Sequence, residues 1–462
     1  MGNVNTITLP ATEIEVVDID VCVAGGGTAG CMAAIAAARN GAKVLMVEKL
    51  PVPGGTLTNG GIGVSSYYNQ CDDPKDAKRI VGGLAYEMID KLIESGGATS
   101  FAMTPDNPQR NAYRVVADHE PYKGVIAEML MEAGVEVLLN CMVSEVVMDG
   151  SKIDYIVVDR RDKRVAYRAK TYVDATGDGD VAKKAGATML DMTHGQECAT
   201  GMVFGIGGID WDRVLEENKG VFHEITSNEM NDKGVMNKNY IFALGYAPQK
   251  YGMMKSLEGI KILSMQVNHP GEATYVNLSR GEILDGTDPE ELSKAELRVR
   301  LRLKNIVEDF KKYVPGFENA YLSWASVQLG VRISYIVKCD YSITQDDIHN
   351  ARRFDDEIGL YGFHDLAAKA GENIPIQGDG FYGFPYRMLL PVGCDNLLVA
   401  GRCVTEEYEA HMSTRNTVGC MIMGEAAGTA AAICSKSGKM TREIEYAQLA
   451  EALKKDDVIL SI

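Results

Sequence analysis

The sequence predicts an α/β fold, in which a parallel sheet carries an antiparallel β-meander and a mixed α+β domain is inserted into the chain. Three observations support this prediction. A strand–turn–helix–strand pattern occupies residues 18–49, and runs with a period of two fill residues 135–175. Between residues 188 and 315 these patterns give way to mixed strands and one amphipathic helix, and buried elements return from residue 322.

The 462 residues suffice for one large discontinuous domain with an insertion. We therefore predict that residues 1–187 and 322–440 form one domain and that residues 188–321 form the inserted domain. Residues 441–462 are expected to form a helical tail at the C-terminus.

The first unit has the order of elements found in a nucleotide-binding βαβ motif. Residues 19–24 form an apolar run that is typical of a buried strand. A helix of small residues is expected over 28–40, and a second strand over 44–47. The alanines of this helix allow it to pack very close to a sheet.

The turn between the first strand and the helix carries three glycines, Gly25, Gly27 and Gly30, in a G-x-G-x-x-G pattern. These glycines let the backbone approach a pyrophosphate, which the N–H groups at the helix start bind. Glu48 follows Gly30 by 18 residues, near the spacing of a carboxylate that binds a ribose hydroxyl. The complete pattern predicts a Rossmann-type site for an adenine dinucleotide.

The composition argues against several kinds of partner. The chain holds 47 basic and 64 acidic residues, a net charge of −17, which argues against nucleic acid or an anionic membrane. Its ten cysteines contain no C-x-x-C pair, and its histidines lack the spacing of metal ligands, so we expect neither an iron–sulfur cluster nor a metal site. Cysteines in apolar surroundings and an N-terminus without signal character lead us to expect a cytoplasmic protein.

Further elements are predicted along the rest of the chain. Residues 50–64 form a glycine-rich loop of the kind that lies against a flat ring or a phosphate. Residues 135–175 are expected to form an antiparallel meander that leads into TGDGD at 176–180 and a short helix. Helices are expected over residues 84–95, 120–132, 293–313 and 417–435, and a buried strand over 396–400.

A second glycine cluster, GIGG at 205–208, lacks a following helix, and we predict that it bends a strand. The chain then has one dinucleotide site, so a second electron partner must enter the same pocket.

Several segments of the chain resemble one known family. They are VAGGGTAG with VEK, PGGTLTNGG, DATGDGDVAKKAGA, QLGVRISYIVKCDYSIT with ARRFDDEI, PYRMLLP, and NLLVAGRC followed by STRNTVGCMIMGEAAGTAAA. Together they span nearly the whole chain, which resembles the FAD-dependent oxidoreductases related to the fumarate reductase and succinate dehydrogenase flavoproteins. The resemblance implies a glutathione-reductase-type FAD domain formed by the two outer segments, with the inserted domain facing the substrate.

The resemblance also assigns FAD contacts. It implies that residues of the first βαβ unit and the loop after it, of the meander, and of the last strand and helix hold FAD. These are Gly25, Gly27, Thr28, Ala29, Gly30, Glu48, Lys49, Gly54, Gly55, Thr56, Val143, Ala175, Thr176, Gly177, Gly401, Arg402, Cys420 and Met421. The start of the last helix carries partial positive charge, which suits the pyrimidine edge of a reduced flavin. Relatives with covalent flavin have a histidine in the loop after the first unit; this loop has none, so we expect non-covalent FAD.

Candidate catalytic residues lie mainly near the C-terminal helix. Arg415 is the first choice, because its guanidinium can clamp a carboxylate or enolate oxygen; the alternative is an arginine bonded to backbone carbonyls around the flavin. His364, Tyr408 and His411 are candidates for moving a proton, and the sequence leaves the choice among them open. Arg387 is expected to contact flavin or substrate.

Arg332 is expected to brace the domain junction instead.

We therefore expect an enzyme that transfers hydride between a small, anionic organic molecule and FAD. The sequence leaves two other functions open: a flavin-binding subunit or sensor without catalysis, and a dehydrogenase that binds NAD.

Overall fold

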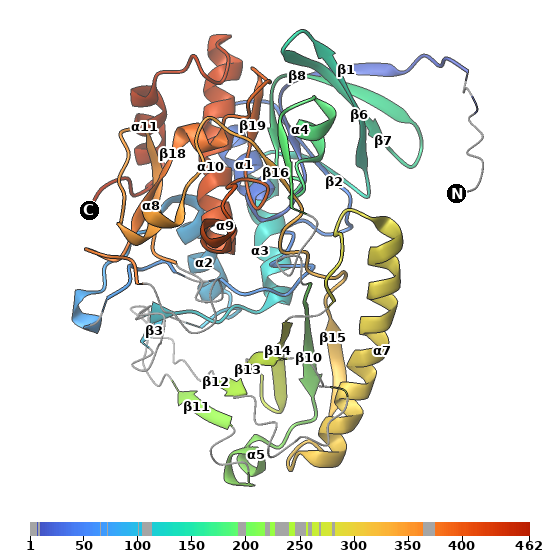
Figure 1. Ribbon diagram of the computed structural model, residues 1–462, viewed down its shortest axis with the longest axis vertical. Coiled ribbons are helices and arrows are strands. Elements are labelled where there is room, and N and C mark those ends of the chain that lie inside the picture. The colour runs from blue at the N-terminus through green and yellow to red at the C-terminus, as the bar shows by residue number, and fades with distance from the viewer. Residues whose placement is uncertain are drawn as a thin grey trace.

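The structure is a computed structural model, in which two sheets organise the chain (Figure 1). It describes residues 7, 10–64, 66–71, 73–99, 101–103, 113–192, 200–217, 222–226, 240–244, 256, 261–267, 269–279, 282–363 and 375–462. His364 therefore lies outside the described residues.

The first sheet has seven strands in the order β5-β2-β1-β8-β7-β6, with β19 paired to β8. Its strands are β1 (Glu15–Ala24), β2 (Val44–Glu48), β5 (Glu136–Leu139), β6 (Met142–Asp149), β7 (Lys152–Asp159), β8 (Arg164–Asp174) and β19 (Leu397–Val399). The pairs β5–β2, β2–β1, β1–β8 and β8–β19 are all parallel. This sheet and its helices confirm the predicted α/β class.

The prediction of a four-stranded meander is wrong for its first strand. Only β6, β7 and β8 pair antiparallel, whereas β5 joins the parallel sheet beside β2. A period of two shows that a strand has two faces but does not identify its neighbour. The helices between β2 and β5 supply the long crossover that a parallel pair needs. β8 belongs to both parts, because it pairs with β7 near its start and with β19 near its end.

The first sheet and the elements packed against it are called the first half of the molecule below. Two helices cross at close range in its core. They are α1 (Thr28–Arg39) and α10 (Thr417–Ser437). A Cβ on Gly424 or Gly428 of α10 would meet the backbone of α1 at Ala29 or Ala33, so only glycine permits this distance. The small side chains of both helices therefore serve close packing of helix on helix, in addition to packing on the sheet.

The remaining elements of this half complete its cover. They are η1 (Pro74–Asp76), α2 (Gly83–Glu94), β3 (Ala102–Met103), β4 (Tyr113–Arg114), α3 (His119–Glu132), α4 (Asp180–Lys184), α8 (Gln345–His349), β17 (Glu357–Tyr361), β18 (Tyr382–Pro385), η5 (Tyr386–Leu389), α9 (Tyr408–Thr414) and α11 (Tyr446–Lys455). Helices α2, α3, α4 and α10 confirm predicted helices to within a few residues.

The second sheet is antiparallel, in the order β11-β12-β13-β14-β10-β15, and lies below the first half in Figure 1. Its strands are β10 (Met202–Gly207), β11 (Phe222–Thr226), β12 (Tyr240–Leu244), β13 (Lys261–Val267), β14 (Glu272–Ser279) and β15 (Tyr321–Ala325), accompanied by α5 (Trp211–Glu217) and α7 (Pro289–Tyr313). A separate apolar core, including Phe204, Ile206, Leu303 and Phe310, joins sheet and helix. The register of β10 shifts at Gly205, which confirms the predicted strand bend.

The chain leaves and re-enters the first half through paired strands, since β9 (Met189–Asp191) pairs antiparallel with β16 (Tyr335–Val337). Trp324 of β15 contacts both halves. Its Nε1 donates to the Thr274 carbonyl at 2.9 Å, its ring lies 3.7 Å from the His119 ring, and it fills the space over Gly61.

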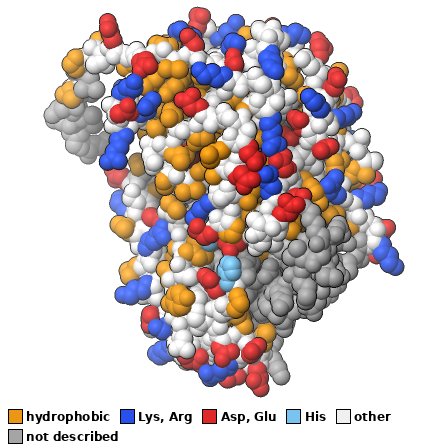
Figure 2. Space-filling view, turned by 180° about the vertical axis from the view of Figure 1, so that it is seen from behind, with side chains coloured by type: hydrophobic (Ala, Val, Ile, Leu, Met, Phe, Trp, Pro, Cys, Tyr) orange, Lys and Arg blue, Asp and Glu red, His pale blue; other side chains and the backbone are white. Residues whose placement is uncertain are grey.

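Basic and acidic side chains are interspersed over the face shown in Figure 2. Among the residues that the structure describes, one helix, α10, is long and apolar enough to cross a membrane, but its apolar window is entirely buried in the protein. It is the central helix of the core.

Candidate active site

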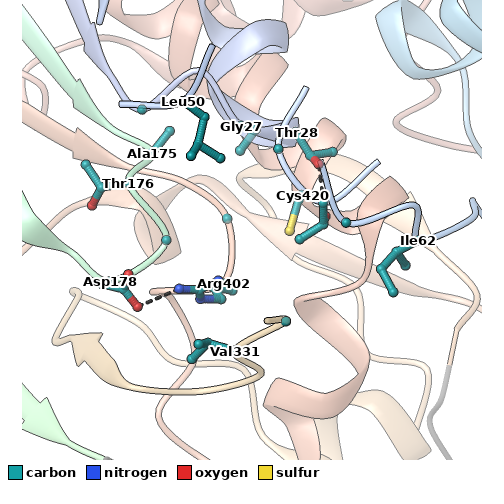
Figure 3. A pocket seen from close by; sticks show the side chains of 18 of the residues that line it. Gly27, Thr28, Leu50, Ile62, Ala175, Thr176, Asp178, Val331, Arg402 and Cys420 are labelled. Atoms are coloured by element: carbon teal, nitrogen blue, oxygen red, sulfur yellow. Dashed lines mark hydrogen bonds and ion pairs between the residues drawn. The ribbon is translucent and has the colours of Figure 1, made fainter. Parts of the chain in front are cut away.

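A cavity of about 400 Å³ lies where the parallel strands of the first sheet end (Figure 3). The strand registers place the carboxyl ends of β2, β1, β8 and β19 side by side. The residues that follow these four strands, Lys49, Gly25, Ala175 and Ala400, all line the cavity. Ligands of open α/β sheets bind at this edge.

The glycine turn after β1 is shaped by backbone contacts. Gly25 has a φ of +91°, and a Cβ there would lie 2.5 Å from the Ala175 carbonyl oxygen. A Cβ on Gly30 would overlap the carbonyl oxygen of Gly25. The turn then lies close to the segment after β8, and Gly27 opens α1 toward the cavity.

Glu48 is buried at the end of β2, with 6% of its surface exposed. One carboxylate oxygen accepts the Gly26 N–H at 2.7 Å, and the other accepts the Leu50 N–H at 2.7 Å. These two bonds fix the carboxylate against the glycine turn. Each oxygen retains acceptor capacity, which suits a pair of ligand hydroxyls.

An ion pair between Asp178 and Arg402 borders the cavity, as Figure 3 shows. Arg402 Nη2 lies 2.5 Å from Asp178 Oδ1, and the Ser334 hydroxyl donates to the same oxygen. Burial alone would raise the pKa of Asp178, but Arg402 and Ser334 outweigh it and hold the pKa below its ordinary value. Within the described part of the chain, the buried Nε of Arg402 has no hydrogen-bond partner. A bound molecule with an acceptor atom would satisfy it.

Two helix N-termini face the cavity. The N-cap of α1 is Gly27 and that of α10 is Asn416; neither gives a side-chain capping bond, and neither helix has an acidic residue in its first turn. Both ends therefore present partly positive N–H groups to a ligand. Cys420 of α10 lines the cavity, donates its thiol to the Arg415 carbonyl at 3.1 Å, and has its pKa raised to about 12 by burial.

The second sheet and the segment after it form the other wall. Val203 of β10 and both Tyr275 and Asn277 of β14 line the cavity, and the Asn277 amide donates to the Tyr275 hydroxyl at 3.1 Å. Gly201, before β10, also lines this wall, as do five residues that follow β15: Ser326, Gln328, Gly330, Val331 and Arg332.

Arg415 lines the cavity from the C-cap of α9. Its Nη2 contacts the Met412 sulfur at 3.5 Å. Arg332, expected only at the domain junction, also lines the cavity, while its Nη1 donates to the Thr200 carbonyl at 3.1 Å. The structure therefore brings these two arginines to the cavity together with Arg402.

The histidine and tyrosine candidates are placed differently. His411 is fully buried behind the cavity wall, with its ring nitrogens 3.4 Å from the Val404 carbonyl and 3.2 Å from the Arg332 carbonyl. Burial and the nearby Arg415 lower its pKa to about 4, so its ring is neutral at physiological pH. Tyr408 begins α9, packs beside Ile333 and Ile336, and is not among the lining residues. The choice of proton donor stays open.

Arg387 also lies away from the cavity lining. Its Nη1 is 3.2 Å from Asp356, and its guanidinium lies over the rings of Tyr341 and Phe354, 5.1 and 5.6 Å from their centroids. In this position it braces the segment between α8 and β17.

Most of the residues assigned to FAD come together around the cavity. These are Gly25, Gly27, Thr28, Ala29, Glu48, Lys49, Gly55, Thr56, Val143, Ala175, Thr176, Gly177, Gly401, Arg402 and Cys420. Gly30, Gly54 and Met421 are not in the lining. Gly54 instead ties the loop to the glycine turn, because its N–H donates to the Gly26 carbonyl at 2.8 Å, and Met421 is fully buried.

Sequence reasoning missed other lining residues. They include Leu50, Ile62, Cys141, Met142, Asp178, Asp180, Tyr275, Asn277, Ser326, Gln328 and Val331. The acidic pair lies in the TGDGD motif, which could have indicated it, whereas nothing local marks Tyr275 or Asn277 as cavity residues.

These features together fit a dinucleotide. A glycine turn, a fixed acidic side chain at the ribose spacing, two open helix N-termini and an unsatisfied buried guanidinium N–H all meet at one cavity. The fold and the site define a Rossmann-type, dinucleotide-binding enzyme.

The chain belongs to the family of FAD-dependent oxidoreductases, whose family model matches residues 20–453. Its cofactor is FAD, which excludes the alternative of an NAD-binding dehydrogenase. It is an enzyme, which excludes the alternative of a non-catalytic flavin-binding subunit.

Similarity to individual proteins is more distant. The chain is 27% identical over 197 residues to digeranylgeranylglycerophospholipid reductase 1 of Methanococcoides burtonii, covering 42% of this chain and 46% of that protein. It is 26% identical over 192 residues to NADH:fumarate oxidoreductase of Klebsiella pneumoniae, covering 34% of this chain and 20% of that one. The matched part is thus less than half of either relative. A solved geranylgeranyl bacteriochlorophyll reductase-like protein of Thermoplasma acidophilum aligns with 96% of this chain and 85% of its own, at 14% identity and a TM-score of 0.44.

Proposed function

We propose that this enzyme transfers hydride between FAD, held without a covalent bond, and a small anionic organic molecule, with Arg415 binding the anionic group. The observation that carries this proposal is the cavity wall itself, to which Arg332, Arg402 and Arg415 all contribute. FAD when bound supplies the acceptor or donor of the hydride.

The charges around the cavity support an anionic substrate. Arg402 is paired with Asp178, and the Glu48 carboxylate is held by two backbone N–H groups. Arg415 comes directly before α10, so its guanidinium and the positive end of that helix act in the same direction. A carboxylate or enolate oxygen would gain from both.

The chain's own residues would orient the substrate and exclude water. Second-sheet residues and the 326–332 segment close the cavity on the side opposite the glycine turn. Burial of the reacting carbon against the cofactor between these walls would hold the two in one geometry, which is a large part of the rate gain in such enzymes.

Anaerobic half-reactions test the proposal. To test electron donors, the purified holoenzyme is mixed with lactate, malate, succinate and glutamate, and with the neutral amide of each, while the absorbance of oxidised flavin is followed. To test electron acceptors, the dithionite-reduced enzyme is mixed with pyruvate and fumarate. We expect at least one anion, and not its neutral counterpart, to change the flavin redox state. Arg415→Ala should weaken that half-reaction by about 10- to 100-fold, the loss typical of one charged hydrogen-bonded contact.

Arg168→Ala is the matched control, because Arg168 pairs with Asp154 on the meander at an exposed site. An Arg415→Ala enzyme with unchanged affinity and unchanged half-reaction rate would overturn the assignment of Arg415. Activity with neutral molecules alone would overturn the anionic substrate.

A further inference from the structure

We propose that Arg332 and Gln328 are substrate-recognition residues, and that Glu296 and Arg300 of α7 are positioning residues that hold them in the cavity wall. This inference rests on the proposed function and deepens it. The anionic group would meet Arg332 as well as Arg415, and a neighbouring hydroxyl or carbonyl oxygen would meet the Gln328 amide.

Gln328 and Arg332 belong to the 326–334 segment, which connects β15 with β16. Four of its residues besides Arg332 line the cavity: Ser326, Gln328, Gly330 and Val331. No helix or strand contains these positions. Their placement therefore depends on bonds from other elements.

Two side chains of helix α7 make three of these bonds from behind the segment. Arg300 Nη2 donates to the carbonyl oxygens of Ser326 at 2.6 Å and Val327 at 3.0 Å. Glu296 accepts the Leu329 N–H at 2.8 Å. One side chain thus binds carbonyl groups and the other binds an amide of the same four-residue stretch.

Glu296 and Arg300 also pair with each other. They are one helical turn apart on α7, and Arg300 Nη2 lies 2.6 Å from Glu296 Oε1. Because each charge is neutralised by the other while both reach the backbone, the pair acts as one rigid clamp. A surface ion pair alone would add little stability, so the clamp's effect lies in the geometry of the segment.

Other bonds tie the segment to the first half and to Gly201, the residue before β10. The Val327 N–H donates to the Asn59 carbonyl at 2.7 Å, in the loop that follows β2. Gly330 exchanges two backbone bonds with Gly201, at 2.7 and 3.1 Å. The Arg332 carbonyl lies 3.2 Å from His411 Nε2. Bonds on both sides leave the segment little freedom, and they fix which side chains face the cavity.

The location of Gln328 and Arg332 distinguishes substrate from cofactor contacts. The assigned FAD residues come from β1, β2, β6, β8, β19 and the adjoining loops and helices of the first half. Gln328 and Arg332 share their wall with Tyr275 and Asn277 of the second sheet. A molecule held between the two walls would meet these polar groups on the face turned away from the glycine turn.

The experiment measures ligand binding and local order in the same holoenzyme. Oxalate and acetate are titrated into the oxidised enzyme, and their dissociation constants are read from the flavin visible spectrum. Hydrogen–deuterium exchange of peptides covering residues 326–334 reports on the clamp. Arg332→Gln should weaken oxalate binding about tenfold or more with unchanged FAD content, because one charged contact is lost.

Arg300→Ala should weaken oxalate several-fold and speed exchange at Leu329 and Gly330. Arg298→Ala is the matched control on the same helix, since Arg298 pairs with Glu282 and makes no bond to the segment. It should change neither readout. Glu296→Gln and Arg300→Lys, which keep a hydrogen-bonding group, should give intermediate effects, and they replace Arg300→Ala if that variant does not fold.

Unchanged oxalate affinity in Arg332→Gln would overturn the recognition residues. Unchanged exchange in the α7 variants, or equal effects of Arg298→Ala and Arg300→Ala, would overturn the clamp. If the wild-type enzyme binds neither oxalate nor acetate, the proposed anionic site and the recognition residues both fail, while the exchange measurement still decides the clamp.

Discussion

The crossing of α1 and α10 makes a quantitative prediction about two glycines. A Cβ on Gly424 would lie 2.9 Å from the Cα of Ala29 and overlap its carbonyl oxygen, and a Cβ on Gly428 would lie 2.8 Å from the Cα of Ala33. Both obstacles are backbone atoms of α1, which cannot rotate away as a side chain can. Since Ala29 lines the cavity, a displaced α1 also alters the cofactor site.

The expected magnitude is the difference between two opposing effects. Replacing glycine by alanine in a helix interior gains about 1 kcal/mol. Overpacking a well-packed core costs about 1–3 kcal/mol, and an overlap with rigid backbone falls at the upper end of this range. We therefore expect Gly424→Ala to lower the free energy of unfolding by about 2 kcal/mol and to reduce FAD retention.

Denaturant unfolding and the FAD content of the purified protein measure both effects. Gly124→Ala is the matched control, because Gly124 lies at an exposed position within α3 and a Cβ there would meet nothing within 4 Å. That variant should gain up to about 1 kcal/mol. If Gly424→Ala is as stable as Gly124→Ala and retains FAD fully, the reasoning from close helix packing is refuted.

Two further predictions concern buried acid–base groups. Glu425 is buried in α10, where its carboxyl accepts the Leu84 N–H, and burial raises its pKa from 4.5 to about 8. Because the pKa in the folded protein is higher than 4.5, the wild type should lose stability relative to Glu425→Gln as the pH rises from 4.5 to about 8. Unfolding midpoints of both proteins across this pH range test the prediction, and a difference between them that does not change with pH contradicts it. Cys420 has its pKa raised to about 12, and no histidine is among the described cavity-lining residues. Acid precipitation should therefore release flavin into the supernatant, whereas a yellow pellet over a colourless supernatant would show a covalent bond.

The dinucleotide half was predictable because its signals are local. The glycine pattern, the alanine-rich helix and Glu48 lie within one βαβ unit, and each has a physical reason that involves only its neighbours in sequence. The structure places Gly25, Gly27 and Glu48 at one cavity, as this unit alone predicts.

Long-range pairing accounts for the errors. The pattern of β5 is that of any two-sided strand, and only the fold decides that it pairs with β2 instead of β6. The partner of Arg402 is Asp178, 224 residues earlier, and no spacing rule connects them.

Residue type alone also does not predict which side chain can donate a proton in the cavity. His411 has the chemistry of a general base and stands four residues before Arg415, yet its ring is fully buried and faces backbone carbonyl oxygens. Residues four apart on a helix lie on the same face, yet Arg415 lines the cavity whereas His411 Nε2 lies 3.2 Å from the carbonyl of Arg332. That histidine therefore acts on the cavity wall through the backbone it binds.

The second wall depends on the register of strands far apart in sequence. Tyr275 and Asn277 reach the cavity because β14 pairs with β10, and the 326–334 segment reaches it because β15 pairs with β10 on the other side. Neither arrangement has a local signature, so a substrate pocket built from them can change without altering the FAD motifs. In this chain, then, the proposed FAD contacts lie mainly in short contiguous patterns, whereas the proposed substrate contacts depend on the packing of α7 and the second sheet against the first.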